Sequence, residues 1–336
     1  MIPAEAPRRL VVRMPNWLGD AVMALPALGA LRAEWPDTDV TLAASPAVAP
    51  VFEERTPAAP QHILRLDKAG ERAALAAGAF DAILLLTNSF RTAWTASRAG
   101  IPERWGYQAS GRALLLTRTV GRPRHEVHQS EYYLALVRGL GVAAPAAAPR
   151  IELSETAIGR ARRLLEQHGV SQAETLVGFA PGAAYGHAKR WPPERAAAVV
   201  TRLVREHAAR CVLVGAAADR EAGRAIESSL PHGAGVVNLI GRTDLRTLMG
   251  LLHACRAFVS NDSGAMHLAA AVGVPVTAIF GPTKANVTAP LGDHDVLRHP
   301  VFCSPCMLRE CPIDHRCMKR ITPDEVYAAV ARRLEP

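Results

Sequence analysis

The chain has 336 residues, of which 49% are hydrophobic, and it carries a formal net charge of +8 with an isoelectric point near 9.5. This length and apolar content suit a globular protein of about two domains, and the sequence shows neither a signal-peptide pattern nor an apolar run near the ~20 residues of a membrane span. We therefore expect a cytoplasmic protein. The charge favours an acidic partner, and alone it does not choose among a nucleotide-sugar, an anionic lipid surface and a nucleic acid.

The first predicted strand, residues 10–14, leads through a glycine-containing turn into a helical run over 21–34. Pro26 has no N–H to donate, so we expect a kink or a short first turn in that run. Asp20 should then lie at a helix start above the sheet, with Gly19 allowing a ligand to approach closely. From these residues alone, a structural role for Asp20 as a helix N-cap is an equally good interpretation.

Strand-like and helical segments alternate through the first half, which predicts a parallel sheet with helices on both faces. The apolar runs are at 40–44, 63–66 and 82–86, and the helical segments include 71–77, 92–99 and 127–139.

Residues 91–124 hold seven arginines and one acid, Glu103. Such a basic segment suits the phosphates or carboxylates of a large acceptor, although a solvated face explains most charge runs. Aromatic residues within it are sparse, and the chain has no helix-turn-helix, zinc-finger or RNA-binding signature. A nucleic acid partner is therefore disfavoured.

A proline- and alanine-rich stretch, residues 142–149, reads as a linker, and the alternation then begins again. The predicted elements of the second half are helices at 155–168, 193–207, 220–229 and 245–254, strands at 176–179, 211–214 and 236–239, and a last helix at 323–334. We expect two α/β domains in tandem with a cleft between them. Neither half has a G-x-G-x-x-G or Walker motif, so a nicotinamide enzyme or a P-loop NTPase has no support.

Residues 257–282 read as a complete strand, polar turn, helix and second strand. The turn ends in Asp262, Ser263 and Gly264, just before the predicted helix, where backbone N–H groups and the helix dipole favour an anion such as a phosphate. His267 lies one turn into that helix. The alternative is that Asp262 and Ser263 only cap the helix and that His267 is a surface residue.

The loop at 181–192 is rich in small residues and precedes a predicted helix. It contains Lys189, one of only four lysines beside 35 arginines. A lysine at this place can offset the charge that develops on a departing diphosphate. The alternative is a surface lysine near a helix start.

Three motifs together resemble the signature blocks of the bacterial lipopolysaccharide heptosyltransferases: PNWLGD at 15–20, PGA with KRWP over 181–192, and NDSGAMHL at 261–268. The similarity covers nearly the whole chain. The cysteine loop of this chain, residues 303–317, is similar to that of the heptosyltransferase II branch. The resemblance implies a GT-B fold of two Rossmann-like domains. Residues 1–149 would bind the acceptor and 150–321 the donor ADP-heptose, while the helix within 322–336 would pack back on the first domain.

The resemblance also implies roles for single residues. Asp20 matches the general base, which takes the proton of an acceptor hydroxyl, and Lys189 matches the lysine on the donor diphosphate. The remaining donor-binding residues would be Asp262, Ser263, Gly264 and His267, with Asp219 or Glu221 on the ribose. The acceptor-binding residues would be Asn16, Trp17 and Gly19, and we add Arg118 and Arg122 as a hypothesis for its negative groups.

Cys211 and Cys255 lie in apolar segments and are predicted core residues. The remaining cysteines, Cys303, Cys306, Cys311 and Cys317, either hold a structural zinc or are packing thiols in a reducing compartment. The resemblance implies that no metal or other cofactor is required for catalysis.

The sequence therefore predicts an inverting enzyme that moves L-glycero-D-manno-heptose from ADP-heptose onto the heptosyl-Kdo inner core of lipid A, at the cytoplasmic face of the inner membrane. The alternatives are another GT-B transferase for a surface glycan, an epimerase that cleaves a nucleotide-sugar, and a non-catalytic nucleotide-sugar-binding protein.

Overall fold

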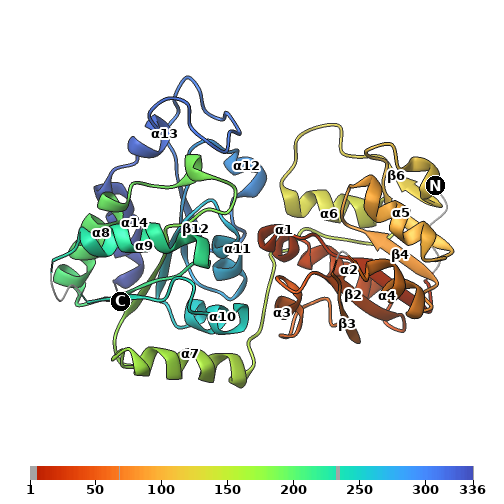
Figure 1. Cartoon of the computed structure of the whole chain (residues 1–336), viewed down its shortest axis with the longest axis horizontal. Coiled ribbons are helices and arrows are strands. Elements are labelled where there is room, and N and C mark those ends of the chain that lie inside the picture. The colour runs from red at the N-terminus through yellow and green to blue at the C-terminus, as the bar shows by residue number, and fades with distance from the viewer. Residues whose placement is uncertain (1–5, 68, 232–234, 336) are drawn as a thin grey trace. The chain divides into compact units, whose positions relative to one another are not determined.

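The computed structural model describes residues 6–67, 69–231 and 235–335 of the chain. By its contacts the chain divides into two compact units, Met1–Glu152 and Leu153–Pro336, in each of which strands and helices alternate (Figure 1). Within the described ranges, no helix has both the length and the apolar character needed to cross a bilayer.

The first unit is built on six parallel strands. They are β1 (Arg9–Arg13), β2 (Asp39–Ala44), β3 (His62–Arg65), β4 (Ala82–Leu85), β5 (Glu103–Tyr107) and β6 (Arg118–Val120). Their order is β3-β2-β1-β4-β5-β6, and Val11 of β1 lies opposite both Thr41 of β2 and Ile83 of β4. This is the 3-2-1-4-5-6 order of a doubly wound nucleotide-binding sheet.

Helices cover both faces of this sheet (Figure 1). They are α1 (Leu18–Met23), α2 (Leu25–Glu34), α3 (Ala49–Phe52), α4 (Glu71–Ala77), α5 (Phe90–Arg98) and α6 (Gln129–Arg138). Helices α1 and α2 pack with α6, while α4 packs with α5. Leu75 of α4 and Ala93 of α5 share a buried core with Val11 and Ile83, which places these two helices on one face of the sheet.

The second unit repeats this plan with six more parallel strands. They are β7 (Leu176–Ala180), β8 (Arg210–Leu213), β9 (Val236–Asn238), β10 (Ala257–Asn261), β11 (Val276–Ile279) and β12 (His294–Leu297). Their order is β12-β11-β10-β7-β8-β9. Read from β9, this is the same 3-2-1-4-5-6 order as in the first unit, so each half is a complete Rossmann-like sheet.

The helices of the second unit are α7 (Glu155–Gln167), α8 (Pro193–His207), α9 (Arg220–Ser228), α10 (Leu245–His253), α11 (Gly264–Ala271), α12 (Ala285–Thr288), α13 (Arg316–Lys319) and α14 (Pro323–Leu334). Helix α10 packs with α7 and α11, and α8 packs with α9 and α14. Val326 and Val330 of α14 lie in one buried core with Val177 of β7, so this last helix completes the second unit. That it also reaches the first unit stays a prediction.

The predicted α/β class with two parallel sheets is confirmed. The expected interruption near Pro26 is also present, because α1 ends at Met23 and α2 begins at Leu25, with Pro26 in its first turn. Pro26 is tolerated there because the first N–H groups of a helix have no intrahelical partner.

Three strands of the structure were not among the predicted elements: β5, β6 and β12. Arg104 and Gly106 interrupt the apolar pattern of β5, β6 has only three residues, and every residue of β12 is only partly buried. Outer strands of this kind lack the continuous apolar run of a strand that is buried on both faces.

Candidate functional site

In doubly wound sheets, ligands bind beyond the carboxyl ends of the strands, at the point where the strand order reverses. That point lies between β1 and β4 in the first unit and between β7 and β10 in the second. The segments that follow these four strands contain most of the residues singled out in the sequence.

Lys189 and Asp262 meet at the reversal point of the second unit. Lys189 Nζ donates to Asp262 Oδ2 at 2.6 Å, and the hydroxyl of Thr283, which follows β11, donates to the same oxygen at 2.6 Å. The two charged side chains are only 11% and 8% exposed. Because an ammonium group has three donors and Asp262 engages one, Lys189 retains donors for an anionic ligand. Thr283 was not predicted from the sequence.

The amino end of α11 begins immediately after this ion pair. Ser263 occupies its N-cap position, but its side chain makes no capping bond and instead lies 3.0 Å from the Ser260 hydroxyl. Asp262 is engaged by Lys189, and His267 is only 5% exposed. The alternative interpretation of Asp262 and Ser263 as side-chain caps, and of His267 as a surface residue, is therefore wrong.

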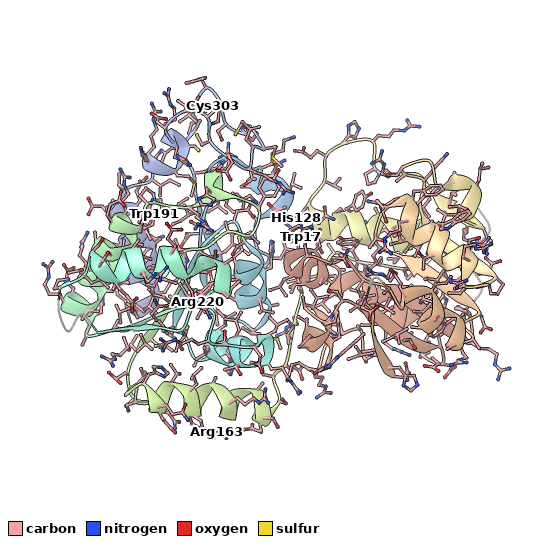
Figure 2. The ribbon with its side chains drawn as sticks, in the orientation of Figure 1. Trp17, His128, Arg163, Trp191, Arg220 and Cys303 are labelled. Atoms are coloured by element: carbon pink, nitrogen blue, oxygen red, sulfur yellow. The ribbon has the colours of Figure 1, made fainter. Side chains whose placement is uncertain are left out.

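Asn261 fixes the loop that carries Lys189. Its amide Nδ2 donates to the carbonyl of Pro181 at 2.7 Å, and its Oδ1 accepts from the backbone N–H of Trp191 at 3.2 Å. Trp191, labelled in Figure 2, is buried, and its indole donates to the carbonyl of Ile321 at 3.1 Å. Both ends of the loop are thus tied down, which limits the positions that the Lys189 backbone can take.

The cysteine loop, residues 303–317, also contacts the loop that carries Lys189. Lys189 Nζ lies 4.6 Å from the centre of the Tyr185 ring, and the Tyr185 hydroxyl donates to the carbonyl of Met307 at 2.8 Å. A Cβ at Gly186 would lie 2.3 Å from the carbonyl oxygen of Arg309, so only glycine permits this approach. Tyr185 therefore contacts the lysine through its ring and the cysteine-containing loop through its hydroxyl.

Asp219 and Glu221, the two candidates for the ribose, differ in their surroundings. Asp219 is buried, accepts from the backbone N–H of Ala216 at 3.1 Å and pairs with Arg190 at 3.3 Å. Glu221 is exposed in the first turn of α9. The local contacts of Asp219 hold its carboxylate in place, so this arrangement favours Glu221 as the carboxylate that a ligand can reach.

Cys211 and Cys255 are buried core residues, as the sequence predicted. Burial raises the pKa of the Cys211 thiol to about 12, which keeps it protonated and unreactive. The other four cysteines, Cys303, Cys306, Cys311 and Cys317, are free thiols. Among the described residues, no group of three or more His, Cys, Asp or Glu side chains is placed to hold a metal ion, so the zinc option gains no support.

Asp20 lies in the first unit, after β1, and it is not the N-cap of its helix. Trp17 occupies that position, and Asp20 is the third residue of α1. The Tyr133 hydroxyl from α6 donates to Asp20 Oδ1 at 3.1 Å. Burial raises the pKa of Asp20, and the Tyr133 hydrogen bond partly opposes that rise. The structural N-cap interpretation is thus wrong, and Tyr133 is a partner that the sequence did not reveal.

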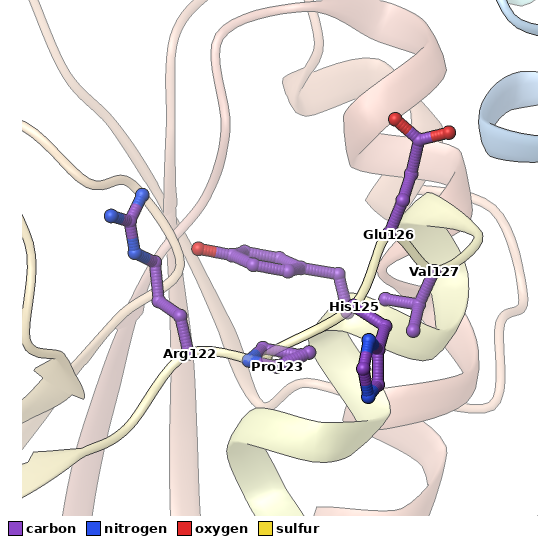
Figure 3. Close-up of a pocket in the computed structure, with 6 residues that line it drawn as sticks. Arg122, Pro123, His125, Glu126 and Val127 are labelled. Carbon is purple, nitrogen blue, oxygen red and sulfur yellow. The ribbon is translucent and has the colours of Figure 1, made fainter.

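A pocket of about 450 Å³ opens beside the start of α6 (Figure 3). Its lining residues are Arg122, Pro123, His125, Glu126, Val127 and Tyr132. The Tyr132 hydroxyl accepts from the Asn88 amide at 2.9 Å, and the positive charge of Arg122 opposes the rise that burial gives to the pKa of Tyr132. Arg118, the other predicted acceptor arginine, lies half-buried in β6 and does not line this pocket.

Arg112 is fully buried close to this pocket. Its guanidinium donates to the carbonyls of Tyr107 and Thr87 and to Oδ1 of Asn88, and all three of these oxygens are uncharged. Burial lowers its pKa to about 10, so it keeps its charge at neutral pH. Arg112 belongs to the basic segment 91–124, which was predicted to form a basic surface. In the structure its side chain is buried inside the first unit.

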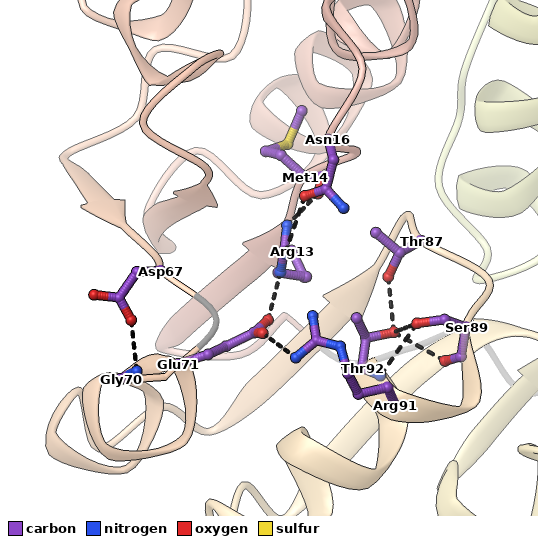
Figure 4. Close-up of polar contacts among 10 residues, drawn as sticks. All are labelled: Arg13, Met14, Asn16, Asp67, Gly70, Glu71, Thr87, Ser89, Arg91 and Thr92. Atoms are coloured by element: carbon purple, nitrogen blue, oxygen red, sulfur yellow. Dashed lines mark hydrogen bonds and ion pairs between the residues drawn. The ribbon is translucent and has the colours of Figure 1, made fainter. Parts of the chain in front are cut away.

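The turn between β1 and α1 is held by a buried ion pair (Figure 4). Arg13 Nε donates to Glu71 Oε1 at 2.6 Å, and another of its nitrogens donates to Asn16 Oδ1 at 3.2 Å. Glu71 also accepts from Arg91 at 2.7 Å. Trp17, in the same turn, is 58% exposed. This network therefore orients the polar side of the turn while the indole remains accessible.

Two Rossmann-like sheets of the same order in tandem are the architecture of the GT-B fold. Residues 71–316 match glycosyltransferase family 9 (heptosyltransferase), and the chain belongs to this family. The protein is therefore a glycosyltransferase, and the resemblance stated from three sequence motifs is confirmed.

Particular relatives are similar over most of their length. Lipopolysaccharide heptosyltransferase 2 of Escherichia coli (strain K12) is 32% identical over 303 residues, which cover 84% of this chain and 85% of the relative. Lipooligosaccharide heptosyltransferase 2 of Haemophilus ducreyi is 27% identical over 97% of this chain and 99% of the relative. The solved structure of E. coli ADP-heptose LPS heptosyltransferase II has a TM-score of 0.84 and 28% identity, covering 97% of this chain and 98% of that one.

Replacing Glu71 by alanine should destabilise the first unit, because Arg13 would be left as a buried charge without its partner. We expect a loss of about 3–5 kcal/mol, measured as the free energy of unfolding in urea. The matched control is Glu152→Ala, which breaks the 3.3 Å pair with Arg55 in which both side chains are more than 70% exposed. That change should cost less than about 1 kcal/mol. Equal losses from both variants would contradict the structural role of Glu71.

Replacing Lys189 by methionine should weaken the binding of a nucleoside diphosphate, because its ammonium group is lost and the Asp262 carboxylate at the start of α11 is left without its counter-ion. We expect the Kd for ADP, measured by calorimetry, to rise roughly ten- to hundredfold, the effect of about 1.5–3 kcal/mol for a charge-assisted hydrogen bond. The control is Lys319→Met, which removes an exposed lysine at the end of α13. An unchanged Kd for the Lys189 variant would remove this residue from the diphosphate site.

Proposed function

We propose that this glycosyltransferase moves L-glycero-D-manno-heptose from ADP-heptose onto the heptosyl-Kdo inner core of lipid A, as the second heptose, with inversion at the anomeric carbon. The observation that carries the proposal is the Lys189–Asp262 pair at the amino end of α11, beyond the central strands of the second sheet. The names of the relatives, lipopolysaccharide and lipooligosaccharide heptosyltransferase 2, support heptose as the sugar and the lipopolysaccharide core as its destination.

In this proposal the donor binds the second unit, within residues 150–321. The diphosphate lies between the Lys189 ammonium and the backbone N–H groups of Ser263 and Gly264, where the helix dipole adds a favourable field. Glu221 accepts hydrogen bonds from the ribose hydroxyls, and Asp219 holds the neighbouring loop. His267, which is buried one turn into α11, packs beneath the phosphates.

The first unit, within residues 1–149, supplies the base. As the acceptor oxygen forms its bond to the anomeric carbon, the bond from that carbon to the ADP oxygen breaks and Asp20 takes the hydroxyl proton. Lys189 offsets the negative charge on the departing diphosphate. A positioned carboxylate of this kind contributes about 10²- to 10⁴-fold to the rate. The chemistry proposed here uses side chains of this chain and assigns no step to a cofactor.

We propose that the acceptor's anionic groups bind the pocket that Arg122 lines and that Arg118, in β6, contributes a further positive charge. The charge of the buried Arg112 adds to the attraction, because no carboxylate neutralises it among the contacts described above. The heptose to be extended would lie against Asn16, Trp17 and Gly19, at the amino end of α1, which carries Asp20.

A membrane-associated acceptor is consistent with a second feature of the first unit. Phe90 and Trp94 of α5 stack with their ring centres 6.3 Å apart, and both are about half exposed. The Arg98 guanidinium lies 6.0 Å from the centre of the Trp94 ring. Aromatic residues next to arginines suit the interface of an anionic lipid layer. We therefore propose a cytoplasmic protein that works at the inner face of the membrane.

Replacing Asp20 by asparagine should lower kcat at least about 10²-fold and leave the Kd for ADP-heptose unchanged, because the base is lost and the donor site lies in the second unit. The assay is transfer of labelled sugar to heptosyl-Kdo-lipid A, with a panel of other nucleotide-sugars as controls for the wild-type protein.

Each alternative predicts a different outcome of that assay. A non-catalytic binding protein would tolerate the Asp20 change, and an epimerase would convert the donor without acceptor. Another GT-B transferase would use a different sugar from the panel. Any of these three outcomes would contradict the proposed reaction.

Reversing the charge of Arg122, or of Arg118, to glutamate should raise the KM for the acceptor and leave the affinity for the donor alone. We expect roughly a tenfold rise for Arg122, the effect of about one lost charge-assisted hydrogen bond, and a smaller rise for Arg118, which does not line the pocket. Arg163→Glu, on exposed α7 of the second unit, is the matched control. An unchanged acceptor KM for both variants would reject the pocket as the acceptor's anion site.

A further inference from the structure

Helix α6 carries two adjacent tyrosines with different surroundings. Tyr132 lines the pocket beside Arg122, whereas Tyr133 is 3% exposed and its hydroxyl lies 3.1 Å from Asp20 Oδ1. One helix therefore connects the proposed acceptor pocket with the proposed base. Neither tyrosine belongs to any of the three sequence motifs.

The direction of the Tyr133 hydrogen bond is fixed by its neighbours. Burial raises the pKa of Tyr133 well above that of an ordinary tyrosine, with the Asp20 charge as the next cause, so the hydroxyl stays protonated. An ionised carboxylate can only accept a hydrogen bond, so the Tyr133 hydroxyl is the donor and its proton points at Asp20 Oδ1.

This bond opposes the effect of burial on Asp20. Burial disfavours a carboxylate and raises the pKa of Asp20, whereas a hydrogen bond donated to the ionised form lowers it. The other titratable residues on the helices packed against α1 are Arg32 and Glu34 of α2 and Glu131, Tyr132 and Arg138 of α6, with His128 at its N-cap, and none of them is a cause of the shift.

We propose that Tyr133 is the positioning residue for Asp20: it holds the carboxylate through Oδ1, so that Oδ2 faces the acceptor hydroxyl. The inference rests on the proposed role of Asp20 as the base. A carboxylate in a short helix needs such a restraint, because a general base must lie within hydrogen-bond reach of the proton that it removes. Tyr133 itself touches neither the donor nor the acceptor in this arrangement.

The decisive variant is Tyr133→Phe, which removes one hydroxyl and keeps the ring in the core. We expect kcat to fall about tenfold, because the carboxylate loses its fixed orientation, while the KM for ADP-heptose stays unchanged. The acidic limb of the pH profile of kcat/KM should move to higher pH. The sign follows because the lost bond favoured the ionised form of Asp20, so a higher pH is needed to ionise the carboxylate without it.

Tyr107→Phe is the matched control. The Tyr107 hydroxyl is equally buried and donates to the backbone carbonyl of Tyr132 at 2.6 Å, so its removal loosens the same helix without touching Asp20. We expect a comparable loss of thermal stability in both phenylalanine variants. Of these two variants, only Tyr133→Phe should move the acidic limb of the pH profile.

Two outcomes would overturn the inference. The first is a Tyr133→Phe enzyme with wild-type kcat and an unmoved limb, and the second is an equal change of kcat and pH profile in the Tyr107 control, which would reduce Tyr133 to a packing residue. Asp20→Asn separates this failure from that of the proposed function. An inactive Asp20→Asn enzyme with an unaffected Tyr133→Phe enzyme rejects only the positioning role, whereas an active Asp20→Asn enzyme rejects the base itself.

Discussion

The ligand-facing end of the second sheet is organised around a buried ion pair, Lys189 with Asp262. Two charges that are removed from water are costly unless each finds a partner, and here the loop after β7 and the strand end of β10 supply one partner each. Thr283 adds a hydrogen bond from the segment after β11. The segments that follow β7, β10 and β11 therefore meet at Oδ2 of Asp262. The hydrogen bond to this oxygen keeps Lys189 beside the amino end of α11.

A buried ion pair also lies at the reversal point of the first unit, formed by different residues. That reversal point is organised by Arg13 and Glu71, a buried pair that contacts Asn16 in the turn leading into α1, the helix that contains Asp20. In both units the charged groups that a ligand would meet are supported by a second, more deeply buried layer of polar contacts. Such support matters because a small displacement of a catalytic group lowers the rate strongly.

The sequence predicted the elements with strong local signals and missed those set by distant contacts. Helices α4, α8 and α14 begin and end where predicted, because α4 starts in an acidic first turn and α8 and α14 have proline there. Strands β5, β6 and β12 were missed because their partners, and not their own residues, make them strands. The motif residues Asp20, Lys189 and Asp262 could be identified, since each follows a recognisable strand. Tyr133 and Thr283 could not, because they lie 113 and 21 residues from the carboxylates that they contact.

The buried Arg112 has a consequence for the conditions under which the nearby pocket attracts anions. Its pKa of about 10 leaves the guanidinium protonated around neutral pH, whereas a histidine at the same place would discharge there. The contribution of Arg112 to the positive potential around Arg122 is therefore constant near neutrality. Because Arg112 is sealed from solvent, mobile salt ions screen it less than they screen a surface charge, so this attraction should persist at ionic strengths that weaken exposed basic patches.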